Sequence, residues 1–128
     1  MKSGSKIILV NNEGKVLLQL RDSCHSYSGS WALFGGHIEG SETPEEALIR
    51  EIKEEINYTL KDYKLIKETV IKDFGKAYWF YGTIDAELSE LHLGEGDDFN
   101  FFTYDEILKL KLAPESKKAL IEYFKNKK

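Results

Sequence analysis

The stretch GHIEGSETPEEALIREIKEEINY, residues 36–58, decides the fold and the chemistry of this chain. It places a glycine-rich segment before a run of helix-forming residues that carries carboxylates at fixed spacing. Glycine lets the backbone bend closely around a ligand, and convergent carboxylates are what hard divalent cations bind. The stretch therefore predicts one unit, made of a loop, a capped helix and a divalent-metal site suited to phosphate chemistry.

The middle of this stretch, residues 44–56, predicts an amphipathic helix. Thr43 is a good N-cap, Pro44 occupies the first helical position, and Glu46 completes a capping box. Asn57 tolerates the left-handed conformation in which many helices end. Apolar residues recur at four-residue steps, which predicts one buried stripe along the helix. This stripe consists of Leu48, Ile52 and Ile56, with Ile49 at its margin.

Three carboxylates of the predicted helix crowd one sector beside this stripe. Glu51, Glu54 and Glu55 have the spacing i, i+3 and i+4, which brings them close together on the helix surface. They repel one another, and the last two also lie near the helix C-terminus, where the dipole disfavours negative charge. A solvent-exposed acidic face is the plain alternative. A bound Mg²⁺ or Mn²⁺ would turn the repulsion into ligation, so we interpret the three glutamates as a metal site.

The whole pattern of residues 36–58 resembles the Nudix box, the motif of the Nudix hydrolases. Every charged position of that motif is kept, including Glu42, which in the family supports the loop and the outer metal shell. Asn57 stands where the family has glycine, and Tyr58 stands where it has an aliphatic residue. Neither change touches a metal ligand. The resemblance implies an α/β fold, the Nudix-type α/β/α sandwich with a mixed central sheet.

The resemblance also implies a role for each of the central positions. Glu51 and Glu55 would be the core metal ligands, with Glu54 close behind and the backbone carbonyl of Gly35 as a further ligand. Arg50 would orient the catalytic glutamate through an ion pair. The implied cofactor is Mg²⁺, with Mn²⁺ as the alternative.

A second acidic group, residues 95–98, precedes a short predicted strand. In Nudix enzymes a loop from this region often supplies another carboxylate, which makes Glu95 a candidate, whereas a polar turn is the alternative. The candidates for the catalytic base are thus Glu51, Glu54 and Glu95, and the sequence does not choose among them. The expected reaction is metal-assisted hydrolysis of a diphosphate linkage by in-line attack of water on phosphorus.

Aromatic side chains near the glycine-rich segment are candidates for stacking a nucleobase. Tyr27 and Trp31 are preferred because they flank the segment, but aromatic residues in strands more often pack in the core or in cross-strand pairs. His37 lies within the segment and is a candidate for a phosphate contact, and an ordinary loop histidine is equally compatible. The same two interpretations are open for Phe34, Tyr78, Trp79 and Tyr81.

The rest of the chain predicts a mixed sheet between helices. An apolar run on each side of residues 11–14 predicts a hairpin, and residues 21–30 predict a loop near the site. The predicted strands are 6–10, 16–20, 31–34, 63–70, 77–84 and 100–103, and the predicted helices are 44–56, 105–110 and 114–124.

Composition predicts a single folded domain over residues 1–128. Hydrophobic residues make up 41% of the chain, enough to form a core. A net charge of −4 argues against a nucleic-acid partner, because no basic excess is present to neutralise phosphates. The single cysteine, Cys24, allows no internal disulfide and favours the reducing cytoplasm. The N-terminal residues lack a run long enough for a signal peptide or a membrane span, and the oligomeric state, monomer or homodimer, is left open.

The expected partner is a small nucleotide substrate, and the expected activity is that of a nucleoside triphosphate pyrophosphohydrolase. The box serves a diphosphate joined to almost any group, and the proline-containing patterns of ADP-ribose-type and NADH-type members are absent. A messenger-RNA cap or an isoprenoid diphosphate stays open as a substrate. The main alternative is a catalytically silent Nudix-fold nucleotide-binding or sensor module, which would usually lose box carboxylates. A simple divalent-ion buffer would not need Gly35 and Gly36.

Overall fold

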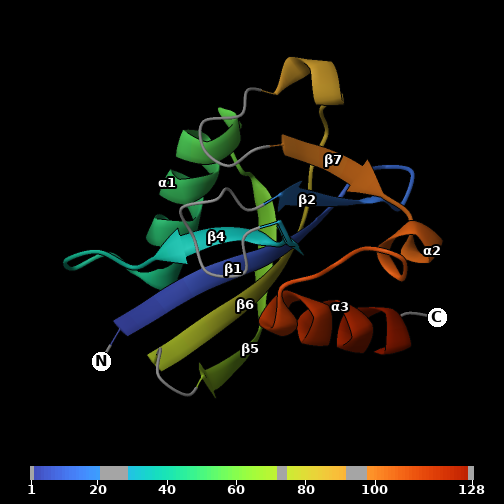
Figure 1. Ribbon diagram of the computed structural model, residues 1–128. Helices are drawn as coiled ribbons and strands as arrows, with labels where there is room; N and C mark the ends of the chain where they lie inside the picture. Colours follow the sequence, from blue (N-terminus) through green and yellow to red (C-terminus); the bar gives the residue numbers. More distant parts are fainter. Residues whose placement is uncertain (1, 21–28, 72–74, 92–97, 127–128) are drawn as a thin grey trace.

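The computed structural model describes residues 2–20, 29–71, 75–91 and 98–126 of the chain. Within these residues, a mixed sheet lies between α1 and α3 (Figure 1). The strands are β1 (Lys2–Val10), β2 (Val16–Leu20), β3 (Trp31–Ala32), β4 (Phe34–His37), β5 (Asp62–Ile71), β6 (Gly75–Thr83) and β7 (Asp98–Phe102). The helices are α1 (Pro44–Ile56), α2 (Tyr104–Ile107) and α3 (Pro114–Asn126), with a short 3₁₀ helix at Leu88–Glu90.

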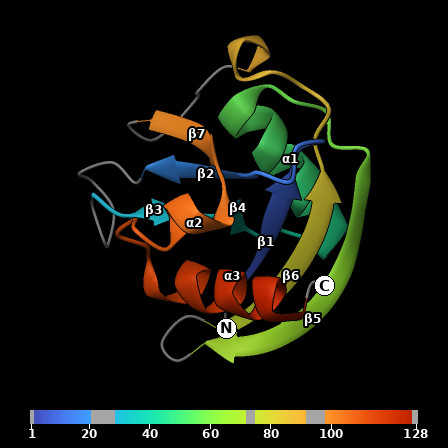
Figure 2. The same cartoon turned by 90° about the vertical axis from the view of Figure 1, so that its right-hand side faces the viewer.

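Strand β1 is the centre of the sheet, and the sheet forks on one side of it. On the unforked side β1 pairs in parallel with β6, and β6 pairs antiparallel with β5. On the other side β1 pairs with β4 through Gly4–Ile7, but only its last residue, Val10, pairs with β2. Strand β2 in turn pairs antiparallel with β3 and with β7 (Figure 2). Leu33, between β3 and β4, lies where the chain passes from one branch of this fork to the other.

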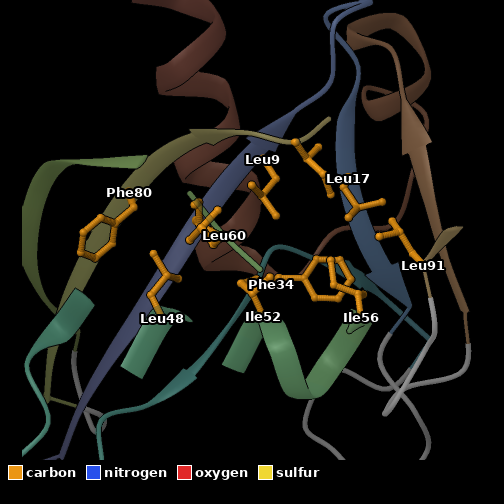
Figure 3. Close-up of a cluster of buried hydrophobic side chains, with 11 residues drawn as sticks. Leu9, Leu17, Phe34, Leu48, Ile52, Ile56, Leu60, Phe80 and Leu91 are labelled. Carbon is orange, nitrogen blue, oxygen red and sulfur yellow. The ribbon is translucent and has the colours of Figure 1, made fainter. Parts of the chain in front are cut away.

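Two apolar clusters fill the space on the two faces of the sheet. Alternate residues of β1 serve both clusters, with Ile7 and Leu9 facing α1 and Ile8 and Val10 facing α3. Phe34 points from β4 toward the buried stripe of α1 (Figure 3). A sheet covered by helices on both faces is the α/β/α sandwich that the resemblance implied.

Helix α1 has the boundaries that its local signals predict. The Thr43 hydroxyl accepts a hydrogen bond from the Glu46 N–H at 3.1 Å, and the Thr43 N–H donates to the Glu46 carboxylate at 2.8 Å. Asn57 ends the helix in the left-handed conformation, with φ of 56°. The predicted stripe is fully buried in the cluster between α1 and the sheet.

The glycine-rich segment was expected to be a loop, which is right for residues 38–43 and wrong for the two glycines before them. Gly35 and Gly36 belong to β4, where they pair with Lys6 and Ser5 of β1. That pairing also extends β1 back to Lys2, beyond the predicted start at residue 6. The cause is an interaction between segments about thirty residues apart, which no local turn signal reveals.

The other predicted strands and helices hold with small shifts of boundary. The loop predicted at residues 21–30 lies mostly outside the described residues. The hairpin between β1 and β2 forms, and the Asn11 side chain accepts hydrogen bonds from the backbone of Glu13 and Lys15. Helix α2 ends at Ile107, so the predicted helix at 105–110 is shorter than expected. Among the described residues, no helix is both long enough and apolar enough to cross a membrane.

Candidate active site

Glu55 is a buried carboxylate at the fork of the sheet. It projects from α1 with only 5% of its surface exposed. Its Oε1 atom accepts from the Gly35 N–H at 3.4 Å, and its Oε2 atom accepts from the side-chain amide of Gln19 at 3.4 Å. Burial, and next the negative charge of Glu51, raise the pKa of Glu55 to about 8, against the opposing effects of Lys6, Gln19 and Gly35.

Glu51 lies one helical turn before Glu55 and packs against the backbone of β4. A Cβ atom at Gly36 would overlap the Glu51 carboxyl group, at 2.6 Å from both of its oxygens. A side chain at Gly35 would collide with the backbone carbonyl of Ser5, and its φ of 148° is itself unfavourable for other residues. The two glycines thus let α1 and β1 approach β4 closely enough to bring these carboxylates to it.

Arg50 donates hydrogen bonds to four groups, which are three carboxylates, Glu51 among them, and one backbone carbonyl. Its Nε and Nη2 atoms donate to the two carboxylate oxygens of Glu42 at 2.7 and 3.0 Å. Its Nη1 atom donates to Glu51 at 2.8 Å and to Glu54 at 3.2 Å, and Nη2 also donates to the His37 carbonyl at 3.0 Å. The hydrogen bond to Glu42 is the main cause that raises the pKa of Arg50, and it likewise lowers the pKa of Glu42.

The three helical glutamates differ in their surroundings. The Glu54 side chain is 58% exposed and contacts Arg50 on the outer surface of the helix. The Glu51 side chain is only 16% exposed, although it contacts the same guanidinium. Glu55 makes its contacts on the opposite, buried side. The structure therefore groups Glu51 and Glu55 with the glycine segment and leaves Glu54 beside them, facing solvent.

These oxygen donors suit a hard divalent cation. A buried carboxylate whose pKa is raised by burial and by a second carboxylate is a group that a cation would stabilise in its charged form. Among the described residues, no three acidic, histidine or cysteine side chains converge on one point. One or two carboxylates completed by water and phosphate oxygens is the set that Mg²⁺ commonly takes in proteins.

Two of the predicted site residues, Tyr27 and Glu95, lie outside the described residues. Trp31 is partly buried in the cluster on the α3 side, and its ring packs edge-on against Phe102 with 4.8 Å between centroids. Because β3 and β7 each pair with β2 and not with each other, this contact favours the core-packing interpretation of Trp31 over base stacking. The His37 side chain is exposed at the end of β4.

The other aromatic candidates have mostly structural surroundings. Phe34 and Trp79 are buried in the core, and Tyr78 packs against the cluster beneath α1. Tyr81 stacks on Tyr123 of α3 at 5.5 Å between centroids. Trp79, Tyr81 and Tyr123 also line a cavity of about 440 Å³ between β5, β6 and α3, on the face of the sheet away from α1.

Gln19 is the site residue that the sequence interpretation missed. It is 9% exposed and contacts Glu55 from the last residue but one of β2. The available signal was one amide in the strand VLLQL, whose other members are apolar. A polar side chain at a buried strand position requires a partner, and here that partner is 36 residues away.

A family comparison agrees with this geometry, because the model of the NUDIX domain matches residues 2–124. The chain belongs to the Nudix family. In this Nudix protein the box runs from Gly36 of β4 through α1 to Tyr58. Tyr58 packs against the cluster beneath α1, and its hydroxyl accepts a hydrogen bond from the Asp85 N–H at 3.2 Å. The aromatic residue at this position is thus accommodated without disturbing the carboxylates.

Named relatives of this Nudix protein include enzymes of two kinds. The RNA pyrophosphohydrolase of Vibrio vulnificus strain YJ016 is 42% identical over 113 residues, and the match covers 74% of this chain and 63% of that protein. The nucleoside triphosphatase NudI of Escherichia coli O139:H28 is 45% identical over 53 residues, covering 41% of this chain and 38% of NudI. The chain therefore matches less than two thirds of the length of either relative.

Solved structures share the fold at lower identity. The MutT protein of Methanosarcina mazei Go1 superposes with a TM-score of 0.76 at 24% identity, over 99% of this chain and 96% of that one. At this identity the likeness establishes the Nudix fold alone.

Proposed function

We propose that this protein is a Mg²⁺-dependent pyrophosphohydrolase that cleaves a phosphoanhydride bond of a nucleoside diphosphate-X compound, with nucleoside triphosphates as the favoured substrates. The observation that carries the proposal is the arrangement of buried Glu55 and Arg50-bound Glu51 over the two glycines of β4. The names of the two enzyme relatives, a pyrophosphohydrolase and a nucleoside triphosphatase, support the same reaction class.

Glu51 and Glu55 would hold the cation, and Mn²⁺ is the expected substitute for Mg²⁺. When bound, the cation neutralises phosphate charge and lowers the pKa of the attacking water. Arg50 holds Glu51 in place through the contact at 2.8 Å.

Hydrolysis of a triphosphate then proceeds by attack of water on phosphorus, in line with the bond that breaks. A carboxylate oxygen accepts the proton of this water, and the phosphoanhydride P–O bond breaks to give a nucleoside monophosphate and pyrophosphate. Glu51, Glu54 and Glu95 are the candidates for the base. Among the described residues we favour Glu54, because it is open to solvent and not enclosed with Glu55.

The substrate is proposed to be a small nucleotide in the cytoplasm and not a long RNA. The net charge of −4 supports this choice, since an RNA would need a basic surface to hold its backbone. The name of the RNA pyrophosphohydrolase makes 5′-triphosphorylated RNA the natural competing substrate. Nucleoside triphosphates and 5′-triphosphorylated RNA must therefore be compared directly as substrates.

The experiment is phosphate release, with added inorganic pyrophosphatase, from a panel of compounds in Mg²⁺. The panel contains nucleoside triphosphates, dinucleoside polyphosphates, nucleotide sugars and a 5′-triphosphorylated RNA. We expect turnover of the triphosphates, loss of that turnover in Glu55→Gln, and retention in Glu45→Gln, which makes the same change at an exposed position of α1. No turnover of any compound, with nucleotide binding intact, would contradict the proposal and favour the silent sensor module.

A further inference from the structure

Gln19 lies at the fork of the sheet with its amide between two acceptors. Its Nε2 atom is 3.5 Å from the Leu33 carbonyl and 3.4 Å from Oε2 of Glu55. Its backbone is fixed on both sides, because Gln19 pairs with Ala32 of β3 and with Phe99 of β7. The side chain therefore projects from a rigid strand and not from a loop.

The orientation of this amide is determined by Leu33. Leu33 lies between two strands, and its N–H donates to the buried hydroxyl of Ser116 at 3.0 Å. Its carbonyl can only accept, so the NH₂ end of Gln19 must face the fork. The second hydrogen of the same NH₂ group then faces Glu55. The Leu33 carbonyl thus sets which end of the Gln19 amide faces Glu55.

Glu55 receives one donor on each carboxylate oxygen from these neighbours. Gly35 donates to Oε1, and Gln19 donates to Oε2, so rotation of the carboxylate about its terminal bond would break both contacts. Removal of the Gln19 donor would leave Oε2 without this contact and would hold the carboxylate less firmly, through the Gly35 N–H on Oε1. Groups that orient a metal ligand through a second contact typically change metal affinity by about 10- to 100-fold when removed.

We propose that Gln19 is a positioning residue of the active site, which holds the Glu55 carboxylate in the orientation that binds the divalent cation. The proposal rests on the proposed function. A neutral donor is suited to this role, because it orients the carboxylate without cancelling its charge. A lysine there would compete with the cation, and an apolar side chain would leave the carboxylate without this donor.

The test is the dissociation constant of Mn²⁺, measured from the EPR signal of free Mn²⁺ without any nucleotide. Gln19→Met removes the amide at nearly constant length and shape. Ser116→Ala is the matched control, because it removes the other side-chain contact to Leu33 and leaves Gln19 beside Glu55. We expect Gln19→Met to weaken Mn²⁺ binding by about tenfold or more, and Ser116→Ala to bind Mn²⁺ as the wild type does. Equal weakening in both variants would overturn the proposal, since Gln19 would then only support the fork.

A second arm tests whether Gln19 acts through Glu55. In a Glu55→Gln background, Gln19→Met should weaken residual Mn²⁺ binding no further, and a further tenfold loss would contradict the proposal. If Gln19→Met does not fold, Gln19→Asn replaces it, because it keeps an amide but shortens its reach. If the wild type binds Mn²⁺ and turns over triphosphate, and Gln19→Met binds Mn²⁺ equally well, this inference is overturned but the proposed function stands. A wild type that binds no Mn²⁺ and turns over nothing would overturn the proposed function as well.

Discussion

Arg50 and Glu42 form a bidentate ion pair, in which Nε donates to Oε2 at 2.7 Å and Nη2 donates to Oε1 at 3.0 Å. The pair joins the segment after β4 to helix α1 and fixes the plane of the guanidinium. With that plane fixed, Nη1 points at Glu51 and reaches it at 2.8 Å. The ion pair at the surface thus determines where a carboxylate of the site is held.

Arg50→Lys should impair catalysis although it keeps the charge. An ammonium group has no rigid plane of donors, so it cannot contact the two Glu42 oxygens and at the same time hold Glu51 in a fixed direction. We expect kcat to fall by about tenfold or more, with the far-UV spectrum unchanged. Lys53→Ala, on an exposed position of the same helix, is the control and should keep kcat. An active Arg50→Lys enzyme would show that the bidentate geometry is not needed.

Gly35→Ala should destabilise the fold far more than Gly40→Ala. Both glycines have positive φ, but a Cβ at Gly35 would also overlap the Ser5 carbonyl, whereas the space around Gly40 is open. We expect a loss of about 3 kcal/mol or more at Gly35 and about 1 kcal/mol at Gly40, measured by urea unfolding. Equal losses would mean that the close contact between β4 and β1 is unimportant.

The metal-free protein should become less stable as pH rises from about 5 to 8. The pKa of Glu55 is raised to about 8 in the folded state, above the ordinary value that it has when unfolded. In this window the folded state binds one proton more than the unfolded state, so stability falls with pH and the contribution is lost above pH 8. Glu55→Gln should remove this slope in urea unfolding measured at several pH values. An identical slope in the variant would assign it to another group.

Glu51→Gln and Glu54→Gln should separate metal binding from catalysis. Glu51 lies over the glycine segment near Glu55, whereas Glu54 faces solvent beside Arg50. We expect Glu51→Gln to weaken Mn²⁺ binding by about tenfold, and Glu54→Gln to keep that affinity but lose kcat. Calorimetric titration and steady-state rates together check both. Lost Mn²⁺ affinity in Glu54→Gln would make Glu54 a ligand, as the family resemblance implies.

Helix α1 could be predicted because its determinants are local. Thr43, Pro44 and Asn57 act within one turn of the helix end that each defines, and the buried stripe follows from spacing alone. The identity and order of the box carboxylates could be predicted for the same reason, because they are read from one continuous segment. The fold class came from the resemblance, and the family match and the solved structures support it.

The parts that could not be predicted depend on contacts between distant segments. Gly35 and Gly36 form a strand because β1 pairs with them. Trp31 packs on Phe102, about seventy residues away, so its position on the α3 side of the sheet has no local signal. The role of Gln19 depends on the fork, which brings Glu55 to it across 36 residues.

The central claim is that Glu55 and Glu51 hold the cation that makes phosphoanhydride hydrolysis possible. The most direct measurement is the rate of nucleoside triphosphate hydrolysis against Mg²⁺ concentration, for the wild type, Glu55→Gln and Glu45→Gln. The account predicts a wild-type rate that saturates with Mg²⁺, the same curve for Glu45→Gln, and little or no hydrolysis by Glu55→Gln at any Mg²⁺ concentration. Hydrolysis that is independent of Mg²⁺, or a Glu55→Gln variant as active as the wild type, would contradict it.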